Sequence, residues 1–306
     1  MKLENDLDTD DIRRLVLRLA LPSMLAQFVS VFYSIVDRMY IGNIPKIGEV
    51  ALAGVGICGP IVTLVSSFAI LVGVGGAPLM SIRLGEKDEK GASQILANCF
   101  LLLSVISVVI TALSLLMKNK LLVWFGASTS IFPYADDYIT IYLLGTIFAL
   151  LSIGMNQFII CQGFAKVAMK SVVLGAVVNI ALDPVFIFAC GMGVRGGALA
   201  TVLSQMASAG YVLLFLFGKK VPVPITFGGY QWRIMKRVIL LGLSPFLIIA
   251  FDNVLIIAMN ASLQHFGGAE GDMLLTCNTI VQSFMLMVTM PLGGITGGTQ
   301  PILGYN

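Results

Sequence analysis

Long apolar segments constrain the fold of this chain more than any other feature of its sequence. Each is about as long as the ~20 residues that a helix needs to cross a bilayer. In hydrocarbon, every backbone N–H and C=O group has to be paired inside the protein, and helices achieve this within one continuous apolar run. We therefore predict an all-α polytopic membrane protein with eight spanning helices, at residues 18–41, 51–80, 94–117, 133–161, 168–190, 196–218, 238–262 and 273–303.

The composition supports a membrane protein. Hydrophobic residues make up 58% of the chain and charged residues 11%, against roughly 45–50% and 25% in soluble domains. The five cysteines lie singly inside apolar segments, without the spacing of a metal site or a redox motif. We expect the lipid bilayer as the surroundings, no cofactor, no nucleic-acid partner and a monomer.

Lysine and arginine predict the orientation. With the N-terminus inside, 14 of these residues fall on the cytoplasmic side and five on the other. Cytoplasmic loops carry such an excess of positive charge. The sequence therefore predicts a multi-pass plasma-membrane protein with a cytoplasmic N-terminus.

The chain also begins to repeat itself. Pro22 and Pro78 recur as Pro245 and Pro301, both at an offset of 223 residues. Matched Pro/Gly-marked apolar segments in two halves are typical of duplicated transporters, and an even number of helices per repeat makes the two copies parallel. We predict a cytoplasmic segment at 1–17, an N-lobe of six helices at 18–218, a cytoplasmic inter-lobe loop at 219–237 and a partial C-lobe at 238–306.

A repeat of 223 residues implies a whole protein of about twice that length. Only the first two segments of the second copy are present, and the sequence stops at Asn306. We expect a chain truncated within its eighth span, from a protein of twelve helices.

Three carboxylates lie inside predicted spans: Asp37, Asp183 and Asp252. Intramembrane acids are costly, so they indicate a functional site. At 1.5 Å per residue, Asp37 and Asp183 lie about 22 Å and 18 Å into a core about 30 Å thick. Asn179 shares a helix face with Asp183, and Thr201 is expected at the same depth on the next span.

These four residues could converge on one ion site. Carboxylate, amide and hydroxyl oxygens are hard ligands that suit a small cation such as Na⁺. Without a metal ion, two adjacent carboxylates would share a proton. Pro184 cannot donate to the carbonyl of Ile180, which frees a backbone oxygen and favours a kink. The alternatives are an interfacial ion pair between Asp37 and Arg38, and a helix-end cap at Asp183.

Further polar and adaptable side chains lie inside the other spans. A possible substrate path would include Asp252, Gln157, Gln205, Gln282 and Met285. The alternative is a purely structural role: interhelical hydrogen bonding for the glutamines and ordinary packing for Met285. We place no partner with Asp252.

The sequence resembles the multidrug and toxic compound extrusion (MATE) transporters of bacterial type. Four stretches carry the resemblance: Val36-Asp37-Arg38-Met-Tyr-Ile-Gly, Asn179-Ile-Ala-Leu-Asp183-Pro184, Gly196-Gly-Ala-Leu-Ala-Thr201-Val-Leu-Ser-Gln205 and Gln300-Pro301-Ile-Leu-Gly-Tyr-Asn306. The resemblance implies two six-helix lobes and export of bulky, often cationic, amphipathic compounds against inward Na⁺ or H⁺. It also implies that Asp37, Asn179, Asp183 and Thr201 take the coupling ion. The stretch from Cys161 to Lys170 departs from the family pattern.

The leading hypothesis is therefore a cation-coupled antiporter that works by alternating access of two lobes. The alternative is a flippase of lipid-linked precursors with a related fold, but the intramembrane charges are acidic and argue against a site for diphosphate. An intramembrane enzyme would need a catalytic set that the sequence does not offer, so no enzyme activity is expected.

Overall fold

The computed structural model describes residues 11–125, 127, 129–218, 221–266 and 271–306. The described residues form helices and connecting loops, without a strand. In chain order the helices are α1 (Ile12–Gly42), α2 (Gly48–Gly85), α3 (Glu89–Trp124), α4 (Phe132–Leu144), α5 (Thr146–Ile160), α6 (Ala165–Pro184), the π-helix η1 (Val185–Ala189), α7 (Val194–Leu216), α8 (Trp232–Phe266) and α9 (Gly271–Tyr305).

The helices agree with the prediction of an all-α membrane protein. Among the described residues, α1, α2, α3, α6 with η1, α7 and the Trp232–Met259 part of α8 are long and apolar enough to span a bilayer. Helix α9 occupies the segment predicted as the eighth span but is not among these six. The predicted single span at 133–161 is instead a pair, α4 and α5, bent by 56°.

The bend lies at Gly145, between α4 and α5. A Cβ atom at this position would lie 2.5 Å from a methyl group of Val202 on α7. The absence of a side chain thus lets α7 pack directly against the break. Periodicity alone predicts one long helix here, because an isolated glycine inside an apolar run is tolerated in a helix.

Several helix boundaries differ from the prediction, by up to seven residues at the end of α3, and two of the helix starts are important below. Helix α1 begins at Ile12 rather than at residue 18. Helix α8 begins at Trp232, inside the segment 219–237 that was predicted as a loop. Arg233, Lys236 and Arg237 therefore lie on the first turns of a helix. The bundle end where α1, α3, α6 and α8 begin is called the basic end below.

Helices α1–α7 form the first lobe around two clusters of buried side chains. Near the basic end the cluster includes Met80, Leu96 and Phe158, and near the other end it includes Ile41 and Ile139. All five side chains are almost completely buried. Lipid offers little hydrophobic driving force for helix association, so this close packing holds the lobe together.

The contacts between the first lobe and α8 and α9 follow the sequence repeat. Helix α9 packs along α1, and α8 packs along α2. The offset of 223 residues turns one of these pairs into the other, because α8 repeats α1 and α9 repeats α2. The two interfaces are therefore equivalent, as expected for parallel repeats related by an axis along the membrane normal.

Glycines bring the backbones together at these two interfaces. A Cβ at Gly75 would lie 2.3 Å from the carbonyl oxygen of Val238, and one at Gly298 would lie 2.7 Å from that of Leu19. Gly75 and Gly298 are repeat counterparts. Small residues at helix crossings allow such close approach. The interfaces thus tolerate no side chain at these positions.

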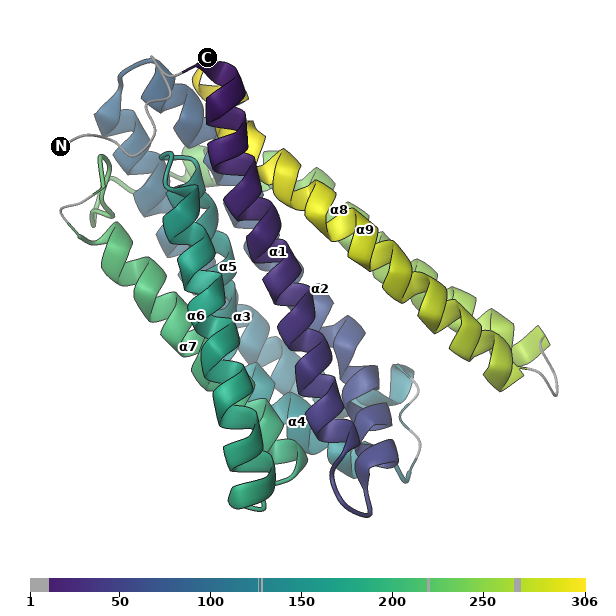
Figure 1. The fold of residues 1–306 in the computed structure, drawn as a ribbon. Coiled ribbons are helices and arrows are strands. Elements are labelled where there is room, and N and C mark those ends of the chain that lie inside the picture. The colour runs from purple at the N-terminus through teal and green to yellow at the C-terminus, as the bar shows by residue number, and fades with distance from the viewer. Residues whose placement is uncertain (1–10, 126, 128, 219–220, 267–270) are drawn as a thin grey trace.

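Close contact is confined to the half of the bundle nearest the basic end. Figure 1 shows α8 and α9 running side by side and diverging from α1 and α2 toward the opposite end. On the diverging parts, Val254 and Val288 are exposed, and so are Phe28 and Phe32 on α1. The two lobes are thus joined near the basic end and spread apart beyond it.

We predict that Gly76→Ala destabilises the first lobe. A Cβ there would lie 2.6 Å from Sγ of Cys99 and 2.7 Å from the ring of Phe158, both fully buried. Overpacking of this kind costs about 1–3 kcal/mol. Thermal unfolding in detergent should show a lower midpoint for this variant. Gly210→Ala is the control, since nothing lies within 4 Å of its Cβ; equal midpoints for the two variants would contradict the packing argument.

Candidate ion site in the first lobe

Three helices of the first lobe bring four polar side chains together. Asp37 lies on α1, Asn179 and Asp183 lie on α6, and Thr201 lies on α7. Asn179 and Asp183 are completely buried, and Asp37 and Thr201 are 8% exposed. These are the residues that the sequence predicted to converge, and we call them the acid cluster. Their role as an ion site remains a prediction.

Asn179 occupies the centre of the acid cluster. Its Nδ2 lies 3.4 Å from Oδ1 of Asp183 and 3.4 Å from Oγ1 of Thr201. The amide thus donates to both neighbours, and α6 supplies two members because residues four apart share a helix face. Asn179 thereby connects α6 to α7.

Three oxygens of the acid cluster have no hydrogen-bond partner. They are Oδ1 of Asp37, Oδ1 of Asn179 and Oδ2 of Asp183, and all are buried. A buried polar atom without a partner is costly, and native structures rarely leave one unsatisfied without a reason. Three such acceptors from one cluster form the oxygen environment that a small cation prefers.

The two carboxyl groups of the acid cluster are close enough to act on each other. Asp37 and Asp183 interact electrostatically between α1 and α6. Two ionised carboxylates can only accept hydrogen bonds. Their proximity therefore favours either a proton on one of the groups or a cation beside them.

The geometry disfavours the two structural alternatives. Arg38 is exposed and forms no ion pair with Asp37 among the described residues, but its positive charge still acts on that buried carboxyl group. Asp183 does not act as a helix-end cap, because its carboxylate accepts from the side chain of Asn179 on its own helix.

The helix carrying Asp183 changes its geometry at the next residue. Pro184 is the last residue of α6, and a π-helical segment, Val185–Ala189, follows. Its wider turn is seen in the bond from the Cys190 N–H to the Val185 carbonyl, at 2.8 Å. Such segments are frequent at functional sites, and a proline at this place removes one backbone donor.

Sequence reasoning did not identify Tyr138 as a neighbour of the acid cluster. Tyr138 interacts with Thr201 and Asp37 of the acid cluster, and only 6% of its surface is exposed. Its ring stacks on that of Tyr142, with a centroid distance of 6.4 Å. The four-residue spacing of Tyr134, Tyr138 and Tyr142 places them on one helix face, and this pattern was the available signal.

The five residues predicted for a substrate path lie on four helices, α5, α7, α8 and α9, and their role stays a prediction. Gln157 and Gln205 are half-buried in the first lobe, where Oε1 of Gln205 lacks a hydrogen-bond partner. Asp252 and Met285 are exposed on α8 and α9. The side chain of Gln282 lies outside the described residues.

The described part of the chain contains no group of three or more His, Cys, Asp or Glu residues that could hold a metal ion. The acid cluster has two carboxylates and completes its set of oxygens with an amide and a hydroxyl. Taken together, the parallel helix repeat and the buried oxygen-rich cluster define a polytopic helical membrane protein built as a duplicated bundle.

Comparison with known proteins identifies the family. Residues 22–185 match the family described as MatE. The chain therefore belongs to the MatE family, which confirms the resemblance predicted from the motifs around Asp37, Asp183 and Thr201. The matched region contains α2–α6 entirely and includes both aspartates of the acid cluster.

Three relatives extend over nearly the whole chain. The "Multidrug export protein MepA" of Staphylococcus haemolyticus is 25% identical over 98% of this chain, which spans 65% of that protein. The "FAD transporter" of Shewanella oneidensis is 26% identical over 100% of this chain and 68% of its own length. The solved structure of the MATE multidrug transporter DinF-BH, in complex with a ligand, is 34% identical, with a TM-score of 0.90, over 100% of this chain and 68% of that one.

The chain thus spans about two thirds of the length of these relatives. Their names describe an export protein and transporters, in agreement with the expectation that the chain is not an enzyme. The structural similarity supports the predicted MATE-like fold.

We predict that the acid cluster makes the stability of the protein depend on a cation. A cation or a shared proton would relieve the repulsion between Asp37 and Asp183. Saturation at about 100 times the Kd stabilises a protein by about 2.7 kcal/mol. The wild-type midpoint of thermal unfolding should rise with Na⁺ in place of choline, or with acidification, and Asp183→Asn should lose the response.

Thr201→Val and Ser204→Ala provide a matched pair for the same measurement. Thr201 offers its hydroxyl to the cluster, whereas the Ser204 hydroxyl donates to the Thr201 backbone carbonyl at 2.8 Å. Thr201→Val should weaken the response and Ser204→Ala should retain it. An unchanged response in Asp183→Asn would remove the cluster as the cation site.

Proposed function

We propose that this chain is part of a cation-coupled antiporter that exports bulky, often cationic, drug-like compounds across the plasma membrane. The observation that carries the proposal is the set of three unpartnered oxygens of Asp37, Asn179 and Asp183, buried inside one lobe of a duplicated bundle. The coupling ion is Na⁺ or H⁺, since either satisfies these oxygens. The N-terminus and the basic end face the cytoplasm in this proposal, in accordance with the positive-inside rule.

The arrangement of the lobes supports alternating access. The lobes pack together near the basic end and diverge toward the opposite end, so the bundle is widest at the end that this proposal places away from the cytoplasm (Figure 1). Coupling requires that the cation and the exported compound each favour a different arrangement of the lobes. Loading of the acid cluster changes the charge on α1, and α1 is the first-lobe helix with the most extensive contact to α9. Helix α1 therefore connects the cluster to the inter-lobe contact.

The names of the relatives support a small-molecule substrate and leave two chemical classes of transported compound. One relative is named for multidrug export, and a solved relative is named as a multidrug transporter. Another, also matched along the whole chain, is named as an FAD transporter. An anionic nucleotide-containing cofactor is therefore the second candidate for the transported compound. These names do not favour the flippase alternative.

Neutralising the acid cluster should abolish transport driven by an ion gradient. In inside-out vesicles containing the full-length protein, Na⁺ and pH gradients are imposed separately, and uptake of a fluorescent organic cation or of FAD is measured. Asp37→Asn and Asp183→Asn should lower gradient-driven uptake at least about tenfold, because removing a buried charge alters ion binding by several kcal/mol.

The control for this experiment is Asp137→Asn, which makes the same chemical change on α4, outside the acid cluster. Asp137 pairs with Arg195 on the surface at 2.8 Å. Wild-type rates in both Asp37→Asn and Asp183→Asn would refute coupling through the cluster. Uptake of FAD but not of the fluorescent cation would select the second substrate class.

We also predict that Gly242→Ala disfavours the described arrangement of the lobes. A Cβ at Gly242 would lie 1.8 Å from the backbone carbonyl oxygen of Leu71, and backbone cannot move aside cheaply. Overpacking by about 1–3 kcal/mol shifts a two-state equilibrium by about fivefold to 160-fold. Transport should fall, while the cation response of the first lobe should remain. Loss of the cation response with normal transport would contradict this separation.

A further inference from the structure

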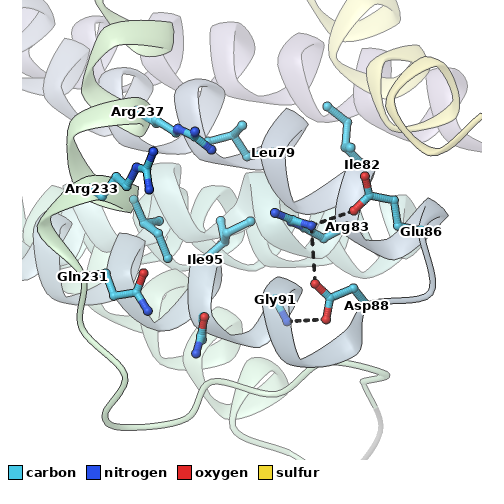
Figure 2. Close-up of a pocket in the computed structure, with 12 residues that line it drawn as sticks. Leu79, Ile82, Arg83, Glu86, Asp88, Gly91, Ile95, Gln231, Arg233 and Arg237 are labelled. Atoms are coloured by element: carbon cyan, nitrogen blue, oxygen red, sulfur yellow. Dashed lines mark hydrogen bonds and ion pairs between the residues drawn. The ribbon is translucent and has the colours of Figure 1, made fainter.

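A cavity opens at the basic end, between the first lobe and α8. Its volume is about 440 Å³, and it is lined by the end of α2, the start of α3, the segment before α8 and the first turns of α8. Figure 2 shows Arg233 and Arg237 on one side of the cavity and Glu86 and Asp88 on the other. We call this cavity the basic pocket. It lies at the opposite end of the bundle from the divergent part of the lobes.

The charges of the basic pocket are unevenly compensated. Arg83 lies 2.8 Å from Glu86 and 3.6 Å from Asp88, so one arginine already engages both carboxylates. Arg233 and Arg237 are exposed and lie one helical turn apart, and they have no ion pair or hydrogen bond with any described residue. Two guanidinium groups are therefore available on one wall of the cavity.

Hydrogen bonds fix the position of that wall. Asn98 on α3 is fully buried, and its Nδ2 donates to the Gly229 carbonyl at 3.2 Å while its Oδ1 accepts from the Gln231 N–H at 2.7 Å. Ser93 and Thr226 add a hydroxyl–hydroxyl contact of 2.9 Å. The segment leading into α8 is thereby anchored to the first lobe, so the shape of the basic pocket is held by specific hydrogen bonds.

The repeat indicates that the fold does not require both arginines. At the offset of 223 residues, Arg237 corresponds to Arg14, but Arg233 corresponds to Asp10. Equivalent positions thus carry two arginines in one repeat and an arginine with an aspartate in the other. The paired positive charge belongs to the second repeat alone.

We propose that the basic pocket binds a phosphate group between Arg233 and Arg237. Guanidinium groups match phosphate oxygens with paired hydrogen bonds, and the amides of Gln94 and Gln231 lie in the same lining. Basic pockets between spanning helices on the cytoplasmic side bind anionic lipid headgroups. The phosphate comes either from such a headgroup or from a soluble phosphate compound. Binding of phosphate does not depend on the proposed transport function, but the argument for a lipid headgroup rests on the orientation proposed with it.

A ligand in the basic pocket would also act on the arrangement of the lobes. One wall comes from α2 and α3 of the first lobe, and the other comes from α8. A ligand that contacts both walls binds best when the lobes are close at this end, and it shifts the population toward that state. The pocket is therefore a regulatory site separate from the acid cluster.

Two measurements on the purified full-length protein test the proposal and separate the two sources. In the first, native mass spectrometry counts phosphatidylglycerol retained from nanodiscs of mixed phosphatidylglycerol and phosphatidylcholine. In the second, thermal unfolding in lipid-free detergent compares potassium phosphate with potassium chloride at equal ionic strength and pH. The wild type should retain phosphatidylglycerol, or be stabilised by phosphate, and R233Q/R237Q should lose that property with about a tenfold lower affinity.

The matched control is R13Q/R14Q, which removes two exposed arginines from the same end of the bundle but outside the basic pocket. Retention of lipid alone identifies a headgroup, and stabilisation by phosphate alone identifies a soluble compound. If the double variant fails to fold, the single variant R237Q takes its place in both measurements. Equal behaviour of R233Q/R237Q and R13Q/R14Q in both measurements would overturn the proposal.

Discussion

Asp37 and Asp183 place two carboxyl groups inside a bundle whose surroundings offer little water, and their burial is the constraint on which the candidate site depends. An uncompensated charge inside a membrane helix costs about 2.5–3.5 kcal/mol on insertion scales. The lobe offsets part of this cost with polar groups from α6 and α7. The amide of Asn179 donates to Asp183 and to the hydroxyl of Thr201. Three oxygens still lack a partner. The cluster thus retains a capacity for positive charge that ordinary packing would have removed.

The second organising feature is the close approach of backbones near the basic end. Gly75 and Gly298 occupy equivalent places in the two repeats, and each meets the backbone of the opposite lobe. Glycine allows this contact because any side chain would collide with a carbonyl group. The same helices separate toward the other end. Because the lobes touch only near the basic end, a small rotation at this contact would displace the far ends of the helices by a large distance.

Much of the fold and of the acid cluster was predictable from sequence because lipid imposes simple rules. Continuous apolar runs have to be helices, and Asp37 and Asp183 stand out as acids within them. The bend at Gly145 was not predicted, because an isolated glycine is tolerated inside a helix. Only the tertiary structure shows that Val202 of α7 packs against this glycine, where a side chain would collide with it. Tyr138 was missed since its contact with Thr201 joins helices α4 and α7, which sequence spacing cannot relate. The start of α8 was placed too late, because charged residues are equally compatible with a loop and with a helix end.

The sequence by itself determined the class of protein, the parallel repeat and the members of the acid cluster, since hydropathy, proline positions and buried acids are local properties. Only the tertiary structure decided which oxygens lack partners and where the lobes touch. It also decided that Arg233 and Arg237 face a cavity while Arg83 is occupied by two carboxylates. The physical reason is that hydrogen-bond satisfaction and charge compensation depend on distances between helices, and those distances are set by packing rather than by position in the chain.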